Sequence, residues 1–285
     1  MTNGATGATR RPQYSDEFRL SITKALGDQL GDAILDLTPA PLEAAVLANL
    51  DARPGVYQLY RCGELVYIGK ADRSLPDRLG QHLRKISGRL NISPAEMTFT
   101  CLYVVEDLSA VAPEALLIKR FQGDGRASWN TNGFGNKDPG RQRDTTVIGA
   151  SHFDAEFPID LDARIEFSPG PRMVKQYLES LKDGLPYNLR YHKELKGRTG
   201  PSVAQVYVDR AELTAREAFE LAMASLPPGW QLTALLGYAV LYKEARSYDS
   251  ALAWWQREPD GRVVETLGRR LVAAGEAMVA PEAED

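Results

Sequence analysis

Residues 55–70 read GVYQLYRCGELVYIGK. Aromatic and β-branched residues, which favour strands, occupy both halves of this stretch. Gly63 lies between the halves, and three-residue hairpin loops place a glycine in the left-handed conformation at this point. We therefore expect a β-hairpin with strands at 55–60 and 65–70, joined by a loop at 61–63.

Two tyrosines of this hairpin, Tyr57 and Tyr67, bear on its chemistry. The three-residue loop predicts that they lie directly opposite each other, with both side chains on one face. A slip of one residue would send the two phenols to opposite faces. Phenols that share a face can build a core, or they can transfer protons.

Composition sets broad limits on the class of protein. The chain has 285 residues, enough for one large domain or two smaller ones, with 44% hydrophobic and 25% charged residues. No apolar run approaches the roughly 18 residues that span a bilayer, and residues 1–11 lack the apolar segment of a signal peptide. Two cysteines are too few for a disulfide framework or a zinc site. We expect a cytoplasmic protein with no membrane partner.

Charge is unevenly distributed along the chain. The net charge of −4 argues weakly against a nucleic-acid ligand. Residues 53–150, however, hold 14 lysines and arginines against 10 carboxylates. The local field matters more than the total charge for a polyanion, so this excess permits such a ligand without requiring one.

The hydrophobic pattern predicts an α+β fold in three parts. Residues 1–52 form a partly helical N-terminal arm, residues 53–165 a domain with a small antiparallel sheet flanked by helices, and residues 166–285 an additional α+β domain of unknown role. After the hairpin, the middle domain is expected to have a helix, a strand, a helix and a polar loop, at 75–88, 98–105, 110–122 and 123–146. In the last domain the pattern predicts helices at 173–181, 215–224 and 263–274, and strands at 203–208, 231–242 and 250–256.

The helix expected at 75–88 carries a polar stripe. Arg78 and His82 are four residues apart and share one face, which Lys85 and Arg89 continue. One interpretation is a solvated basic face. The other is a phosphate clamp, in which arginine offers planar donors and histidine accepts a proton near neutral pH.

Glu114 in the next helix projects toward the apolar side, because Leu117, Ile118 and Phe121 follow at helical spacing. A buried carboxylate needs a partner, since an unpaired buried charge is costly. The partner can be a buried cation or the helix N-terminus. Alternatively, Glu114 is a metal ligand, because proteins often hold Mg²⁺ by one or two carboxylates.

The polar loop includes the stretch WNTNGFGNKDPGRQR at 129–143. Loops of this length within compact domains are usually functional or unstructured. Its phenyl and basic side chains suit groove or backbone contacts with DNA, while a solvated linker is the other interpretation. On the first interpretation, the DNA-binding residues are Arg126, Asn136, Lys137, Arg141 and Arg143.

Other motifs for hydrolysis are missing from the sequence. There is no P-loop, no His-x-x-x-His and no Gly-x-Ser-x-Gly. His152 and His192 lie in expected loops outside the motifs above, and we assign them to the surface.

Six elements, taken in order, resemble the signature of the GIY-YIG nuclease superfamily. They are Gly55-Val56-Tyr57, Tyr67-Ile68-Gly69, Arg78, His82, Glu114 and Asn130. Val56 stands where the family name has isoleucine, which is an exchange of one β-branched residue for another. The Arg-x-x-x-His spacing and the Asn-Gly-Phe-Gly-Asn segment look most like the GIY-YIG type II restriction endonucleases. The resemblance covers about residues 53–150 and does not extend to residues 170–285.

The resemblance implies Mg²⁺-dependent, sequence-specific hydrolysis of double-stranded DNA by a one-metal mechanism, with Mn²⁺ as a substitute metal. The roles it implies are Tyr57 as general base, Lys70 and Arg78 as cations that favour its phenolate, His82 as proton acceptor or positioning group, Glu114 as metal ligand, Tyr67 as a hydrogen-bond partner of phosphate or Tyr57, and Asn130 as the residue that fixes its neighbours. Arg78 would also stabilise the extra negative charge of the transition state.

One active site per chain favours a twofold homodimer for cutting both strands of a palindromic site. A restriction enzyme also implies a companion DNA methyltransferase. Two other functions stay open. The chain can be another GIY-YIG nuclease, for homing, repair or antiphage cleavage of DNA or RNA, or a non-catalytic DNA-binding protein on the same scaffold.

Overall fold

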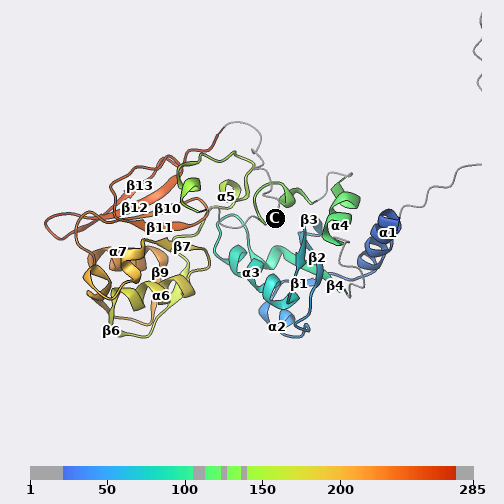
Figure 1. The fold of residues 1–285 in the computed structure, drawn as a ribbon, viewed down its shortest axis with the longest axis horizontal. Coiled ribbons are helices and arrows are strands. Elements are labelled where there is room, and N and C mark those ends of the chain that lie inside the picture. The colour runs from blue at the N-terminus through green and yellow to red at the C-terminus, as the bar shows by residue number, and fades with distance from the viewer. Residues whose placement is uncertain (1–21, 105–112, 123–126, 136–139, 274–285) are drawn as a thin grey trace, which may run out of the picture.

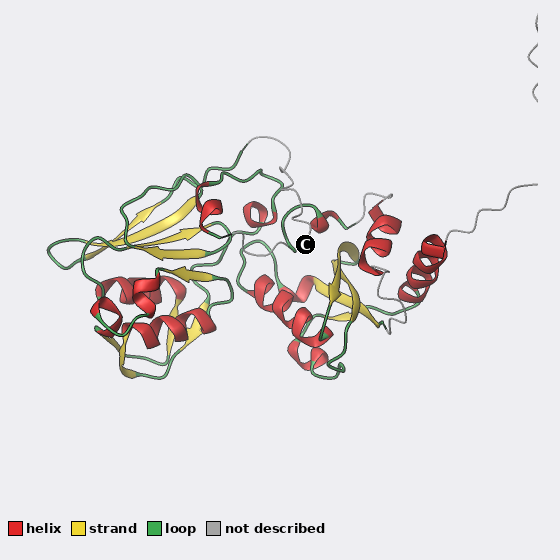
Figure 2. Cartoon of the chain, in the orientation of Figure 1, coloured by secondary structure: helices red, strands yellow, loops and turns green. Residues whose placement is uncertain are grey.

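The structure is a computed structural model that describes residues 22–104, 113–122, 127–135 and 140–273. Two sheets lie in separate halves of the molecule, and helix α3 (Leu75–Ser87) lies where the halves meet (Figure 1). Both halves combine helices with small, mainly antiparallel sheets, as Figure 2 shows. The expected α+β class is confirmed. No helix among the described residues is long and apolar enough to cross a bilayer.

The first sheet is antiparallel, with the strand order β1-β4-β2-β3. Its strands are β1 (Ala40–Pro41), β2 (Gly55–Arg61), β3 (Glu64–Ala71) and β4 (Met97–Tyr103). The last three match the strands that the sequence predicts. The short β1 comes from the expected N-terminal arm, so the arm contributes directly to this sheet.

The β2–β3 hairpin turns over two residues instead of the expected three. Arg61 pairs with Glu64, and the two residues between them, Cys62 and Gly63, have φ angles of 51° and 84°. Two successive positive φ angles are typical of a type I′ turn, whose twist matches that of the strands.

The shorter turn and a bulge between Leu59 and Tyr60 change the register of the hairpin. Tyr57 lies opposite Gly69, and Tyr67 lies opposite Leu59. The prediction that the two tyrosines are directly opposed is therefore wrong. They are diagonal neighbours that still share a face, because the strand positions differ by two and side chains alternate.

Each face of the sheet packs against different helices. Val56 and Ile68 join a cluster with side chains of α1 (Ile22–Leu35) and α4 (Pro113–Gln122). Tyr57, Leu59 and Tyr67 join a larger cluster with α3 and with aromatic residues from the polar loop and the segment after it. The polar loop is thus partly core, since Trp129 and Phe134 are buried. This part of the loop is not a solvated linker. The Phe134 ring is buried and is not exposed for contact with a DNA groove.

Helix α3 begins after Ser74, whose Oγ accepts a hydrogen bond from the Asp77 backbone N–H. Its polar stripe faces inward. His82 in the helix and Arg89 just after it are buried, and Lys85 is partly buried. The interpretation of this stripe as a solvated basic face is therefore wrong.

The second half has a five-stranded sheet with the order β13-β12-β10-β11-β7, in which only β7 runs parallel to its neighbour. Its strands are β7 (Leu189–Tyr191), β10 (Gln231–Leu235), β11 (Ala239–Tyr242), β12 (Ala251–Arg257) and β13 (Val263–Leu267). Helices α6 (Val174–Gly184) and α7 (Ala215–Ala224) contribute to the same core. Two small ribbons complete this half, β5 (Arg164–Glu166) with β9 (Glu212–Thr214), and β6 (Gly170–Met173) with β8 (Gln205–Val208).

Two expectations for this half are wrong. The single strand expected at 231–242 is a hairpin of β10 and β11, and the helix expected at 263–274 is replaced by strand β13. Val263 and Val264 favour a strand, and the edge of β12 offers backbone partners over five residue pairs. These pairings outweigh a helix-like apolar spacing.

Arg89 joins the two halves. Its guanidinium forms an ion pair with Asp154 (2.9 Å) and donates hydrogen bonds to the backbone carbonyls of Phe157 (3.0 Å) and Gly237 (3.2 Å). Asp154 belongs to the short helix α5 (Phe153–Glu156), and Gly237 lies between β10 and β11. The end of α3 is thereby fixed to both neighbouring segments.

We predict that Arg89→Met lowers the free energy of unfolding by about 3–5 kcal/mol, because it leaves the largely buried Asp154 carboxylate without its ion-pair partner. Urea denaturation measures the change. Arg53→Met is the matched control, since Arg53 lies 4.0 Å from Asp51 at an exposed site and should cost at most about 1 kcal/mol. Equal effects of the two substitutions would contradict this role for Arg89.

Candidate active site

The hydroxyl of Tyr57 is the centre of the candidate site. It lies 2.7 Å from His82 Nε2, and Arg78 Nε donates to it at 3.3 Å. Tyr57 comes from β2, whereas Arg78 and His82 lie one turn apart on α3. The tyrosine and the imidazole are buried, and Arg78 is partly exposed. A ligand would therefore approach the phenol from the Arg78 side.

Two glycines leave room for the phenols. A Cβ at Gly69 would overlap the Tyr57 hydroxyl, because the ring lies over this residue from the opposite strand. A Cβ at Gly135 would overlap the Tyr67 hydroxyl in the same way. The two rings then lie 6.1 Å apart between their centroids. Position 69 of the Tyr67-Ile68-Gly69 segment therefore requires a glycine, because any side chain there would overlap the Tyr57 ring.

His82 is a neutral imidazole at physiological pH. Its pKa is held well below 6.5 by burial first, and then by the positive charges of Arg78 and Lys85. The ring stacks on Phe134, with 4.8 Å between centroids and an interplanar angle of 19°. A neutral, fixed imidazole can accept a hydrogen bond from the Tyr57 hydroxyl.

Arg78 stays charged. Burial opposes its charge, but attraction to and hydrogen bonds with Tyr57 and then Tyr67 raise its pKa. Its Nη1 also donates to Gln81 Oε1 at 3.0 Å, which fixes the guanidinium on α3. One cation therefore contacts both phenols.

Asn130 holds the outer strand in place. Its Oδ1 accepts from the Ile68 backbone N–H at 2.9 Å, and its Nδ2 donates to the Ile68 carbonyl at 2.8 Å. Because Ile68 follows Tyr67 directly, this pair of bonds fixes the position of the second phenol. The geometry fits the positioning role expected for Asn130.

Lys70 does not join Tyr57. It pairs with Val56 across the hairpin, on the opposite face from the phenols. Its Nζ lies 3.2 Å from Asp72 Oδ1. Among the contacts of the described residues, Arg78 reaches the Tyr57 hydroxyl and Lys70 does not.

Glu114 lies in the first turn of α4, and its side chain is outside the described part of the structure. The described side chains of α4 pack on the sheet face opposite the phenols. Among the described residues there is no group of three or more histidine, cysteine or carboxylate side chains placed to hold a metal ion. Mg²⁺ needs no such cluster when phosphate and water complete its ligands. Three expected DNA contacts, Arg126, Asn136 and Lys137, also lie outside the described residues.

The other two expected DNA contacts, Arg141 and Arg143, have partners within the protein. Arg141 is exposed, but it pairs with Glu244 at 2.9 Å and lies over the Tyr242 ring. Arg143 Nη2 lies 2.6 Å from His152 Nε2.

The sequence-based assignment of His152 to the surface is wrong. It is buried, and its Nδ1 accepts from the Asp154 backbone N–H at 3.1 Å, at the start of α5. Burial is the main cause that lowers its pKa. His192 caps a short 3₁₀ turn, Lys193–Lys196, and is partly exposed.

Sequence reasoning missed the roles of Phe134 and Lys85. Lys85 Nζ donates to the Phe134 carbonyl at 2.6 Å, which secures the ring that stacks on His82. Burial is the main cause that lowers the Lys85 pKa to about 8. The spacing of Lys85, three residues after His82, places it on the same stripe, but a helix pattern cannot show that the stripe is covered.

Comparison with protein-family models gives no match, and comparison with curated proteins gives none either. The candidate site therefore rests on its own geometry.

We predict that His82 makes stability depend on pH. Below about pH 6.5 the unfolded chain binds a proton at this residue while the folded chain does not, so the free energy of unfolding falls as the pH falls, by up to about 1.4 kcal/mol per pH unit. Urea denaturation between pH 7.5 and 5 should show a smaller slope in His82→Gln. Some slope should persist, because the His152 pKa is lowered as well. An unchanged slope in His82→Gln would refute the prediction.

Proposed function

We propose that the chain is a Mg²⁺-dependent endonuclease with GIY-YIG chemistry that cuts double-stranded DNA at specific sequences, as a type II restriction enzyme does. The observation that carries this proposal is the Tyr57 hydroxyl, which contacts a neutral imidazole and a guanidinium at once. A core phenol needs one hydrogen-bond partner, whereas this arrangement suits proton transfer beside a phosphate.

Tyr57 would act as the general base toward water. The hydrogen bond to His82 directs the phenol proton toward the imidazole, which leaves oxygen lone pairs for Arg78 and for a water molecule. A cation beside a phenol also favours the phenolate. His82 therefore has a positioning role, and it can take up the phenol proton.

Arg78 would stabilise the charge that develops on the phosphorus oxygens. Its guanidinium is partly exposed and is fixed by Tyr57 and Gln81. Planar donors of this kind fit phosphate oxygens, and loss of one such donor typically costs about 10²–10³ in rate.

Glu114 is the residue that would hold the metal. A single carboxylate together with substrate phosphate and water is a common donor set for Mg²⁺, and Mn²⁺ accepts the same oxygen ligands. When bound, the metal supplies charge neutralisation at the scissile phosphate and the leaving oxygen. A homodimer would supply the second active site for the second strand, and a companion methyltransferase would protect the host DNA.

We predict that Tyr57→Phe lowers the rate of plasmid cleavage by about 10²–10⁴, the usual contribution of a general base, while the buried ring keeps the fold. Circular dichroism checks the fold, and single-turnover cleavage gives the rate. Tyr60→Phe is the matched control on the same strand; its hydroxyl donates to Gln58 at 2.5 Å, away from the site. Full activity of Tyr57→Phe would remove the phenol from the mechanism.

We predict that Glu114→Ala abolishes Mg²⁺-dependent cleavage and leaves binding of duplex DNA in EDTA unchanged. The exposed Glu64→Ala is the control and should cleave normally. Parallel loss of binding and cleavage in Glu114→Ala would show a structural role instead. The wild-type digest should give discrete bands; a smear, or cleavage of RNA alone, would favour another GIY-YIG nuclease role.

A further inference from the structure

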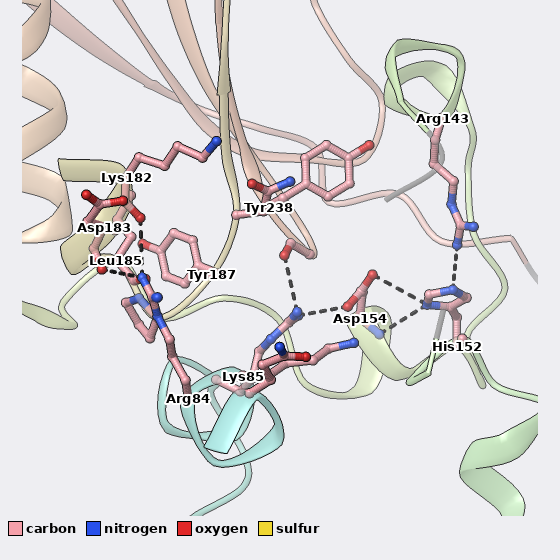
Figure 3. Close-up of a pocket in the computed structure, with 16 residues that line it drawn as sticks. Arg84, Lys85, Arg143, His152, Asp154, Lys182, Asp183, Leu185, Tyr187 and Tyr238 are labelled. Carbon is pink, nitrogen blue, oxygen red and sulfur yellow. Dashed lines mark hydrogen bonds and ion pairs between the residues drawn. The ribbon is translucent and has the colours of Figure 1, made fainter. Parts of the chain in front are cut away.

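A cavity of about 420 Å³ lies between the two halves of the molecule (Figure 3). One wall is α3, with Gln81, Arg84 and Lys85. The opposite wall is the end of α6 with the segment 185–188 and the turn between β10 and β11. A cavity of this size can hold a small organic ligand.

The cavity is lined by five lysine and arginine side chains against two carboxylates. Two of the cations have structural partners. Arg84 donates to backbone carbonyls at the end of α6, including that of Leu185 at 3.0 Å, and Arg89 is paired with Asp154. The Asp154 carboxylate is therefore largely neutralised inside the protein.

The other three cations are Lys85, Arg143 and Lys182, which come from three different segments. In the described part of the chain, none of the three has a carboxylate within ion-pair distance. Arg143 contacts the neutral His152, and Lys85 contacts a backbone carbonyl. Asp183 is the other carboxylate of the lining, so three cations share the cavity with one remaining anion of the protein.

Lys85 responds to this excess of positive charge. Burial lowers its pKa most, the attraction of Asp154 raises it, and the charges of Arg89, Arg78 and Arg143 lower it further. A bound anion would reverse this effect, because an opposite charge nearby favours the charged form.

We propose that this cavity binds a phosphorylated ligand, with Lys85, Arg143 and Lys182 as the cations that line its site. Lysine and arginine are the usual donors to phosphate oxygens. The room beyond a single phosphate, beside Pro186, Tyr187 and Tyr238, would accept the sugar or base attached to it.

The cavity borders the candidate active site without including its reacting groups. Gln81 lines the cavity and accepts a hydrogen bond from Arg78. Lys85 holds the carbonyl of Phe134, whose ring stacks on His82. The phosphate can thus belong to a nucleotide of the DNA backbone or to a free nucleotide, and the proposal does not depend on catalysis.

The test is binding measured in EDTA, so that no cleavage takes place. Isothermal titration calorimetry with inorganic phosphate and with deoxyadenosine monophosphate, at constant ionic strength, tests the free ligands. Fluorescence anisotropy with a labelled 20-base-pair duplex tests backbone phosphate. Lys182→Ala and Arg143→Ala remove charges from the cavity. Lys175→Ala removes the same charge from the start of α6, outside the cavity.

We expect each cavity substitution to weaken phosphate binding at least about tenfold, the usual loss for a charge-assisted hydrogen bond, and Lys175→Ala to leave it unchanged. Binding of phosphate or mononucleotide with this pattern identifies a free nucleotide. The same pattern for duplex DNA alone identifies the DNA backbone. Absence of binding in both arms, or equal effects of Lys182→Ala and Lys175→Ala, would overturn the proposal. Because cleavage is not measured, failure of the nuclease proposal would leave this result intact.

Discussion

The buried guanidinium of Arg89 is the constraint on which the arrangement depends. It follows α3 directly and pairs with Asp154 in a region where an unmatched charge would be costly. Burial disfavours the Asp154 carboxylate, yet Arg89 and then Lys85 lower its pKa, so the pair persists as ions. Since Arg78 and His82 lie on the same helix, the anchoring of its far end also fixes their distance from Tyr57.

A second constraint is steric. The Tyr57 ring crosses the hairpin above Gly69, and the Tyr67 hydroxyl approaches Gly135. Both contacts need residues without side chains. Beyond them, Phe134 stacks on His82 and packs edge-on against Tyr67 at 5.0 Å. The phenols and the imidazole are therefore held rigidly, as groups that must keep hydrogen-bond geometry require.

The sequence predicts elements that depend on local pattern and fails where long-range packing decides. Strands β2 to β4 and helix α3 follow from apolar spacing and from the Ser74 cap, whereas the meeting of Tyr57, Arg78 and His82 is implied only by the family resemblance. The register was beyond reach, because the bulge after Leu59 has no signal in the residue pattern. The resemblance implies a place for Lys70 beside the phenols, but strand alternation puts its side chain on the other face.

Burial of the basic stripe could not be predicted either. The partners of Arg89 lie 65 to 148 positions further along the chain, on segments that have no recognisable relation to α3 in sequence. His152 is buried against Gly133 and Arg143 of the polar loop, a contact that the residue pattern around it does not show. The prediction for strand β13 is wrong in another way. Its apolar spacing predicts a helix, but the segment pairs with β12 as a strand.

The amide of Asn130 has a consequence that is separate from chemistry. Strand β3 is the outer strand of its sheet, and outer strands with open backbone groups can recruit strands of other molecules. By bonding both backbone groups of Ile68, the Asn130 side chain imitates a neighbouring strand and blocks this position. A chain that lost this amide would gain a site for aggregation, whether or not it cuts DNA.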